Sequence, residues 1–118
     1  MSEDQEILHG LVQELRRGTI IIGVLSQLSE PQYGYSLVAI LQEKGIGVEA
    51  GTLYPLLRRL EKQGLLESQW DTNEARPRKY YIISETGKEI YSKLYREWKD
   101  MMMSLEGLVD AKEEKKDL

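Results

Sequence analysis

The chain has 118 residues, of which 41% are hydrophobic and 31% are charged, and its net charge is −4. This length predicts one domain, and this balance of residues is typical of a folded globular protein. The sequence has no cysteine and one histidine, His9, which excludes disulfides, thiolate metal sites and a His-pair metal site. Its acidic start is unlike a signal peptide, and no apolar stretch approaches the ~20 residues that span a bilayer, so we expect a cytoplasmic protein without a membrane segment.

The first predicted helix covers about residues 6–28. One stripe at helical spacing is made by Leu8, Leu11, Val12 and Leu15. Residues 20–25 are then apolar on every side, and a helix of that kind must be covered all round. Because one small core cannot cover both faces, we expect a second copy of the chain to cover one, with Leu8 and Leu11 in the interface. The run of three isoleucines leaves a strand as the alternative for this stretch.

A turn at residues 29–32 precedes a second predicted helix over about residues 33–44. The third, over about residues 51–63, has an apolar stripe made of Leu53, Leu56, Leu57 and Leu60. Its opposite side carries Pro55, Arg58, Arg59 and Lys62, with Thr52 and Tyr54 at the margins. Proline is tolerated in or near the first turn, where the backbone N–H has no partner, so we expect Pro55 to lie there.

Two short predicted strands, residues 65–70 and 79–83, form a β-hairpin whose tip carries Arg76 and Arg78. Ser84 or Thr86 then caps a long helix that ends at about Val109. Its apolar residues follow a heptad spacing, which predicts another helix as neighbour, and they are Tyr91, Leu94, Trp98, Met101, Leu105 and Leu108.

The order of these elements predicts a mainly α fold with a small β-hairpin, namely a winged helix-turn-helix plus one long C-terminal dimerisation helix. We place the winged helix-turn-helix, with its N-terminal helix extension, in residues 1–83 and the dimerisation helix in residues 84–110. Residues 111–118 are charged, and we expect this tail to be disordered.

The basic side of the third helix is the main functional signal. Residues 51–80 carry six basic and four acidic residues, a charge of +2 within a chain of net charge −4. A helix fits the DNA major groove, where Arg and Lys reach base edges or phosphates. Arg76, Arg78 and Lys79 indicate a wing that contacts phosphate or enters the minor groove. The alternatives are a solvated basic face and a solvated hairpin tip.

Trp98 and the methionines after it, Met101, Met102 and Met103, form a candidate second site. Packing within a dimer explains a tryptophan at a seam position. A gap between two indoles on a two-fold axis is an alternative, because it can hold a flat aromatic molecule beside an adaptable methionine lining.

Catalysis has little support, since the sequence has no nucleophile elbow and no phosphate-binding loop. We therefore expect no enzyme, cofactor or metal. DNA, a second copy of the chain and an aromatic effector are the expected partners. The rival functions are a protein-interaction module that uses the same basic face and a drug-sequestering protein that has lost its operator.

The segments GTLYPLLRRLEKQGLLES and RPRKYYIISETG, with LRRGTIIIGVLSQL and YGYSLVAIL before them, resemble the PadR family of bacterial transcriptional regulators. The resemblance covers about residues 15–87. It implies a homodimeric winged-helix repressor that binds an inverted-repeat operator and is released by a small molecule. The DNA contacts it implies are Tyr35, Ser36, Thr52, Tyr54, Pro55, Arg58, Arg59, Arg78 and Lys79.

The single C-terminal helix is similar to the short branch of that family, and YREWKDMMMSLEGL resembles its multidrug-sensing members. In these members a tryptophan at the position of Trp98 stacks on flat drugs at the dimer centre. The resemblance implies that Val12, Leu15 and Thr19 face this ligand.

Overall fold

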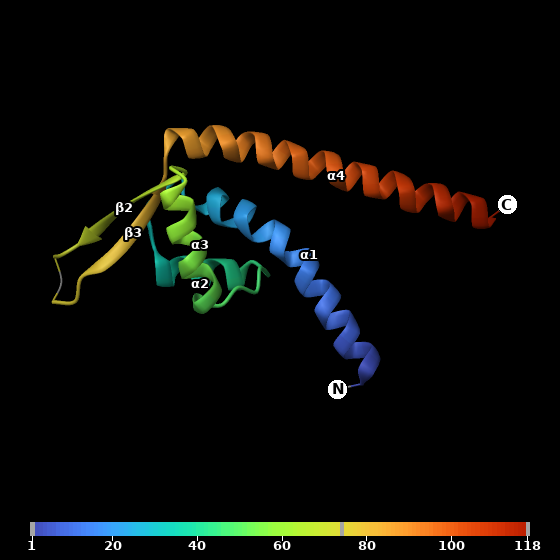
Figure 1. Cartoon of the computed structure of the whole chain (residues 1–118), viewed down its shortest axis with the longest axis horizontal. Coiled ribbons are helices and arrows are strands. Elements are labelled where there is room, and N and C mark those ends of the chain that lie inside the picture. The colour runs from blue at the N-terminus through green and yellow to red at the C-terminus, as the bar shows by residue number, and fades with distance from the viewer. Residues whose placement is uncertain (1, 74, 118) are drawn as a thin grey trace.

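The computed structural model describes residues 2–73 and 75–117, and side chains as far as Ala111 (Figure 1). Its helices are α1 (Glu3–Gln27), α2 (Gly34–Glu43), α3 (Ala50–Lys62) and α4 (Glu85–Asp117). Its strands are β1 (Gln32–Tyr33), β2 (Leu66–Asp71) and β3 (Arg78–Ile83). The fold is therefore mainly α with a small sheet, as the sequence predicts, and the helical interpretation of residues 20–25 is confirmed.

The sheet has three strands in the order β1-β3-β2, and both pairings are antiparallel. Strand β1 was not predicted from the sequence. Gln32 pairs with Tyr81 and Tyr33 with Tyr80, directly after the turn that contains Pro31. A strand of two residues has no alternating pattern of its own, so its pairing with a distant strand defines it.

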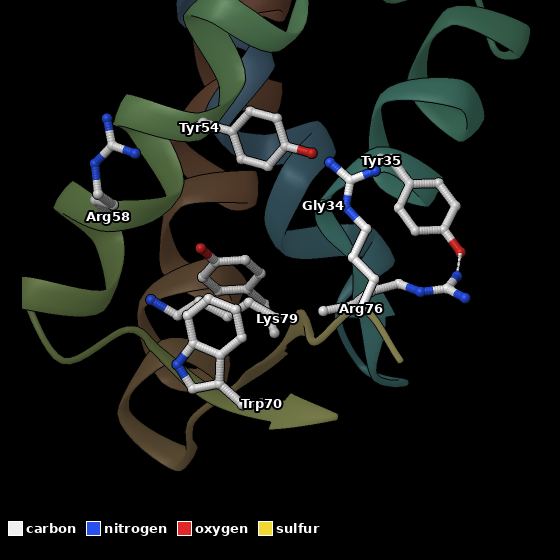
Figure 2. A pocket seen from close by; sticks show the side chains of 9 residues that line it. Gly34, Tyr35, Tyr54, Arg58, Trp70, Arg76 and Lys79 are labelled. Atoms are coloured by element: carbon white, nitrogen blue, oxygen red, sulfur yellow. Dashed lines mark hydrogen bonds between the residues drawn. The ribbon is translucent and has the colours of Figure 1, made fainter. Parts of the chain in front are cut away.

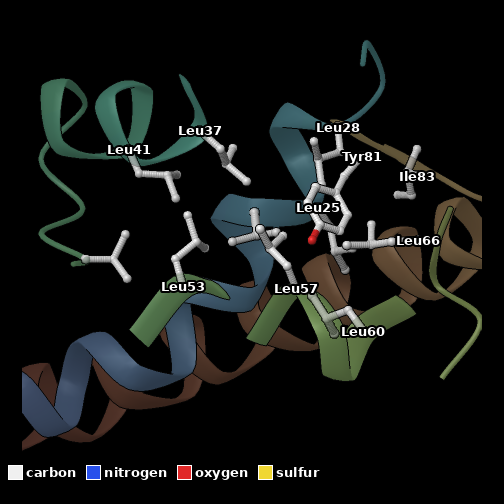
Figure 3. Packing of buried hydrophobic residues seen from close by; sticks show 12 residues of the cluster. Leu25, Leu28, Leu37, Leu41, Leu53, Leu57, Leu60, Leu66, Tyr81 and Ile83 are labelled. Atoms are coloured by element: carbon white, nitrogen blue, oxygen red, sulfur yellow. The ribbon is translucent and has the colours of Figure 1, made fainter. Parts of the chain in front are cut away.

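The core lies where α1, α2, α3 and the sheet meet (Figure 3). Leu53, Leu57 and Leu60 are buried on α3, as the apolar stripe predicts, while Leu56 is half-buried. They pack with buried residues of the other elements, which are Val24, Leu25, Leu28, Leu37, Leu41, Val48, Leu66, Tyr81 and Ile83. Burying these side chains fixes α3 with its opposite side turned to solvent.

Ser84 caps α4 and joins it to the end of α3. Its hydroxyl accepts a hydrogen bond from the backbone N–H of Gly87 at 2.9 Å and donates one to the carbonyl oxygen of Gly64 at 2.6 Å. Its own N–H donates to the carbonyl of Leu65 at 3.0 Å. Of the two candidates, the cap is therefore Ser84 and not Thr86, because α4 begins at Glu85.

Helix α4 continues to Asp117, so the expected end near Val109 is wrong. Residues 111–116, Ala-Lys-Glu-Glu-Lys-Lys, are good helix formers, and neither glycine nor proline interrupts them. Their charged composition is typical of a disordered tail, and it is equally compatible with a solvated helix.

The first half of α1 and the far half of α4 extend away from the core (Figure 1). Leu8, Leu11 and Leu15 of the stripe on α1 are exposed, Leu15 at 74%. The seam on α4 is exposed from Met101 onward, with Leu108 at 67%. Closer to the core, Tyr91, Leu94 and Trp98 are half-buried. A single chain thus leaves two long apolar helix faces in contact with water.

Candidate nucleic-acid interface

Helix α3 presents its basic side to solvent, and Arg58, Arg59 and Lys62 are all exposed. Gly64 ends the helix region in the left-handed conformation, with φ of 82°. Pro55 lies in the second turn of the helix, because α3 begins at Ala50. Pro55 is therefore near the first turn but not within it, and its missing N–H removes one bond from the helix at this point.

The basic side of α3 is divided into two flanks. Tyr54 and Arg58 face the hairpin of β2 and β3, which we call the wing together with its connecting residues. Arg59 lies on the other flank with Thr52 and Pro55, in a second pocket that α1 closes. The sequence predicts these side chains as one face, whereas in the fold they line two different pockets, one on each flank of that face.

A groove of about 740 Å³ separates α3 from the wing, and we call it the wing groove (Figure 2). Tyr54 and Arg58 extend from α3 on one wall, and Trp70 and Lys79 extend from the wing on the other. The remaining lining residues are Gly34, Tyr35, Arg76, Arg78 and Tyr81. Six residues predicted to contact DNA thus meet in one groove, while Ser36 is half-buried and is not among the lining residues.

Trp70 was not predicted as a site residue. It is 63% exposed near the end of β2, opposite Lys79 in the sheet register. Alternation along the strand places Leu66, Ser68 and Trp70 on the same side of the sheet, and Leu66 is buried in the core. That alternation was available in the sequence and indicates that Trp70 stands on the side facing α3.

Arg78 lies against two stacked tyrosines, Tyr33 at the end of β1 and Tyr35 in the first turn of α2. Its guanidinium lies 5.5 Å from the ring centre of Tyr33 and 5.6 Å from that of Tyr35, and the two rings stack at 5.6 Å. Its Nη1 donates a hydrogen bond to the hydroxyl of Tyr35 at 2.5 Å. This predicted phosphate contact therefore joins the wing to α2.

Asp71 strengthens the same junction. It accepts a hydrogen bond from the hydroxyl of Tyr33 at 2.5 Å, which lowers the pKa of Asp71, and the backbone N–H of Asn73 lowers it further. The same bond raises the pKa of Tyr33. β1 and the wing are thereby joined by side chains as well as by the sheet.

Lys79 is engaged with α3. Its Nζ lies 3.3 Å from Oε1 of Glu61 and 5.3 Å from the ring centre of Tyr81. Glu61 also accepts a hydrogen bond from the hydroxyl of Ser68, and this bond, followed by the contact with Lys79, lowers the pKa of Glu61. One carboxylate of α3 thus binds both strands of the wing and offsets the charge of Lys79.

Tyr54 marks the contact between the two helices of the helix-turn-helix. A Cβ built on Gly34 lies 2.3 Å from Cε1 of Tyr54, so glycine at this position lets the ring lie directly on the start of α2. Arg76 is exposed near the tip of the wing.

The residues predicted to bind an aromatic ligand lie on α1 and α4. Tyr95 stacks on Trp98 with ring centres 6.0 Å apart and planes 12° apart. Met101 and Met102 are exposed beyond it. On α1, Leu15 is exposed and Val12 and Thr19 are half-buried, and the hydroxyl of Thr19 donates to the carbonyl of Arg16 at 2.8 Å.

In the described part of the chain, no helix combines the length and apolarity needed to cross a membrane. The described residues also contain no group of three or more acidic, His or Cys side chains placed to hold a metal ion. A helix-turn-helix whose second helix is basic and flanked by a hairpin defines a winged-helix DNA-binding protein.

Residues 21–93 match the model of the transcriptional regulator PadR-like family. A PadR family transcriptional regulator from Eggerthella lenta has a crystal structure 47% identical in sequence, with a TM-score of 0.86 over 89% of this chain and 94% of that one. A PadR-like regulator from Bacillus cereus is 29% identical, with a TM-score of 0.72 over 81% and 96%. Transcriptional regulator Rv3488 of Mycobacterium tuberculosis is 32% identical over 78 residues, which are 65% of this chain and 73% of that protein.

The chain belongs to the PadR-like family of transcriptional regulators. This confirms the resemblance at the level of the family, and with it the expectation of a DNA-binding regulator that is not an enzyme. The resemblance to multidrug-sensing members of the short branch stays a prediction.

Proposed function

We propose that this chain is a cytoplasmic, homodimeric repressor that binds an inverted-repeat DNA operator and is released by a flat aromatic molecule. The observation that carries the DNA part is the exposure of Arg58, Arg59 and Lys62 on the solvent side of α3, beside the wing. Such cations reach base edges and phosphates when the helix enters the major groove.

The exposed apolar faces of α1 and α4 support the dimer. Leu8, Leu11 and Leu15 on one helix and Leu105 and Leu108 on the other are all more than half exposed in the single chain. Contiguous apolar surface of this kind marks an interface. A two-fold dimer that pairs α4 with α1 and α4 of the partner covers both faces. To enter successive major grooves on one side of the DNA, its two copies of α3 must lie about 34 Å apart, or a multiple of that.

A row of stacked aromatic rings on α4 supports the proposed release of the operator by a flat ligand. Tyr91, Tyr95 and Trp98 are stacked in sequence along the helix, so Tyr95 supports one face of the indole. A planar ligand between the two copies of Trp98 stacks on the indoles in the dimer. Such a ligand releases the operator if it prefers the DNA-free geometry by about 1–3 kcal/mol.

The experiment is a selection of bound duplexes from a random pool, followed by titration of the selected duplex at several salt concentrations. We expect an inverted repeat and a steep loss of affinity with salt, because each neutralised phosphate releases counterions. If the selected duplexes share no sequence and their affinity depends little on salt, the proposal is contradicted. That result favours an acidic protein as the partner of the basic face.

A further inference from the structure

We propose that the wing groove holds the sugar–phosphate backbone of one DNA strand, and that Trp70 packs its indole against a deoxyribose of that strand. This inference rests on the proposed function and deepens it. It assigns a role to the one exposed tryptophan of the wing and names the chemistry of its partner.

The position of Trp70 is the first argument. A tryptophan buries a large area when it packs, and 63% of this one is in contact with water at the edge of the groove. It projects from β2 on the side that faces α3, and its register partner Lys79 lies beside it. An exposed indole on the inner wall of a groove is placed to contact whatever enters the groove.

The charge of the groove is the second argument. Arg58 stands on the wall formed by α3, and Arg76 and Arg78 belong to the wing, while none of the lining residues among those that the structure describes is acidic. Glu61 offsets Lys79 through their 3.3 Å contact. Two walls that carry guanidinium groups around an apolar ring match a polyanion with apolar sugars between its charges.

The geometry of duplex DNA is the third argument. One sugar–phosphate strand separates a major groove from the neighbouring minor groove. If α3 enters the major groove and the wing approaches the minor groove, that strand must pass between them. The space between α3 and the wing is the groove that contains Trp70.

The contacts that attach the wing to α3 and α2 hold the wing groove at a fixed width, so that it suits one DNA backbone strand. Glu61 bonds to Ser68 on β2 and contacts Lys79 on β3, so the two walls are held together at the base of the groove. Arg78 and Tyr35 hold the outer side of the wing to α2. The groove is therefore bounded by elements that are tied to one another below and beside it.

The test uses the full chain and the duplex selected above. The sequence contains two tryptophans, so Trp98→Phe leaves Trp70 as the one emitting indole. We expect duplex to quench the emission of Trp70 and to protect it from acrylamide. We also expect Trp70→Ala to lower affinity roughly tenfold, the scale of one aromatic contact, and equally for strong and weak operator sequences because a sugar carries no sequence.

Trp70→Phe is the matched variant, because it keeps an aromatic ring in the groove and should keep most of the affinity. Thermal unfolding midpoints of both variants should stay near that of the parent, since Trp70 is exposed. The inference is overturned if Trp70→Ala binds the duplex as tightly as the parent does. It is also overturned if the complex forms normally and the emission of Trp70 does not change. Either result leaves the proposed function standing.

A mononucleotide provides the second arm. If deoxyadenosine monophosphate quenches Trp70 as strongly as duplex does, the groove is a small-ligand pocket and the inference is wrong. If no duplex from the random pool binds the parent chain, the proposed function itself fails. The two failures are therefore distinguishable.

Discussion

Arg58 and Arg59 are neighbours in the sequence and lie on opposite flanks of α3, Arg58 beside the wing and Arg59 beside α1. Because the two side chains line different pockets, we expect each to contact a different part of the proposed operator. This division is a consequence of the angle of about 100° between successive residues of a helix. We therefore expect the two arginines to contribute separately to DNA binding.

Arg58→Ala and Arg59→Ala should each weaken operator binding, by about 1–3 kcal/mol where the lost contact is to a base. The losses should add in the double variant, since the two side chains line separate pockets. Titration of labelled operator at fixed salt measures this. Arg96→Ala, which removes the same charge from an exposed position of α4, is the control. Parent-like binding by both α3 variants means that α3 does not contact the operator.

Leu105→Glu should shift the chain from dimer to monomer, because it places a charge in the exposed apolar seam of α4. Met103→Glu introduces the same charge into the same helix on the other side, where Met103 is 67% exposed, and should leave the dimer intact. Sedimentation equilibrium at micromolar concentration separates the two results. If both variants show the same oligomeric state, the apolar seam of α4 is not the dimer interface.

Gly87→Ala should destabilise the fold by about 1–3 kcal/mol, since the new Cβ meets the backbone carbonyl oxygen of Leu65 at 2.1 Å. Gly107→Ala lies in the same helix with no heavy atom within 4 Å, and should be neutral or stabilising. Urea denaturation midpoints compare the pair. Equal midpoints indicate that the packing of α4 on the end of α3 is looser than described.

Stability should fall as the pH is lowered below the ordinary value of 4.5 for Glu61, because its pKa is lowered in the folded chain. A carboxyl group whose folded pKa is lowered stabilises the fold above its unfolded pKa, and this contribution is lost as the pH falls through the folded pKa. Glu61→Gln should therefore show a shallower fall in thermal midpoint between about pH 5 and pH 3. Glu85→Gln, at an exposed position paired with Lys88, is the control. If the thermal midpoints of the parent and of Glu61→Gln fall in parallel as the pH is lowered, the Glu61 carboxylate does not stabilise the fold in this way.

Tyr35→Phe should loosen the wing while keeping the ring stack on Tyr33, because it removes the hydroxyl that accepts the bond from Arg78. We expect faster amide hydrogen exchange at residues 78–80, and a loss of at most about 1 kcal/mol in the free energy of unfolding. Tyr80→Phe removes a hydroxyl bonded to Gln69 within the hairpin, and serves as the comparison. Unchanged exchange in Tyr35→Phe shows that the sheet alone holds the wing.

The features that sequence predicted well are those encoded by local spacing. Leu53, Leu57 and Leu60 recur at helical intervals, and this alone fixed both the buried side of α3 and its basic side. Gly64 marked the end of the helix, and the residue types of β2 and β3 marked the hairpin.

The features it missed depend on residues far apart in the chain. Tyr35 and Arg78 are separated by 43 positions, so no local pattern reveals that each is the other's partner. β1 exists because Tyr33 pairs with Tyr80. The extension of α4 was missed for a different reason, since charged residues are compatible with either a helix or a tail.

The hydrogen bonds of Ser84 fix the base of α4 to the turn after α3, and this makes the long helix a rigid lever on the DNA-reading head. Its 33 residues span about 50 Å, so a rotation of about 5° at the pivot moves the far end by about 4 Å. In the dimer proposed above, a molecule held between the two copies of Trp98 would act about 20 Å from this base, less than half-way along α4, where a small displacement corresponds to a larger change of angle than at the far end. A ligand that spread the two helices at that point would therefore change the separation of the two copies of α3.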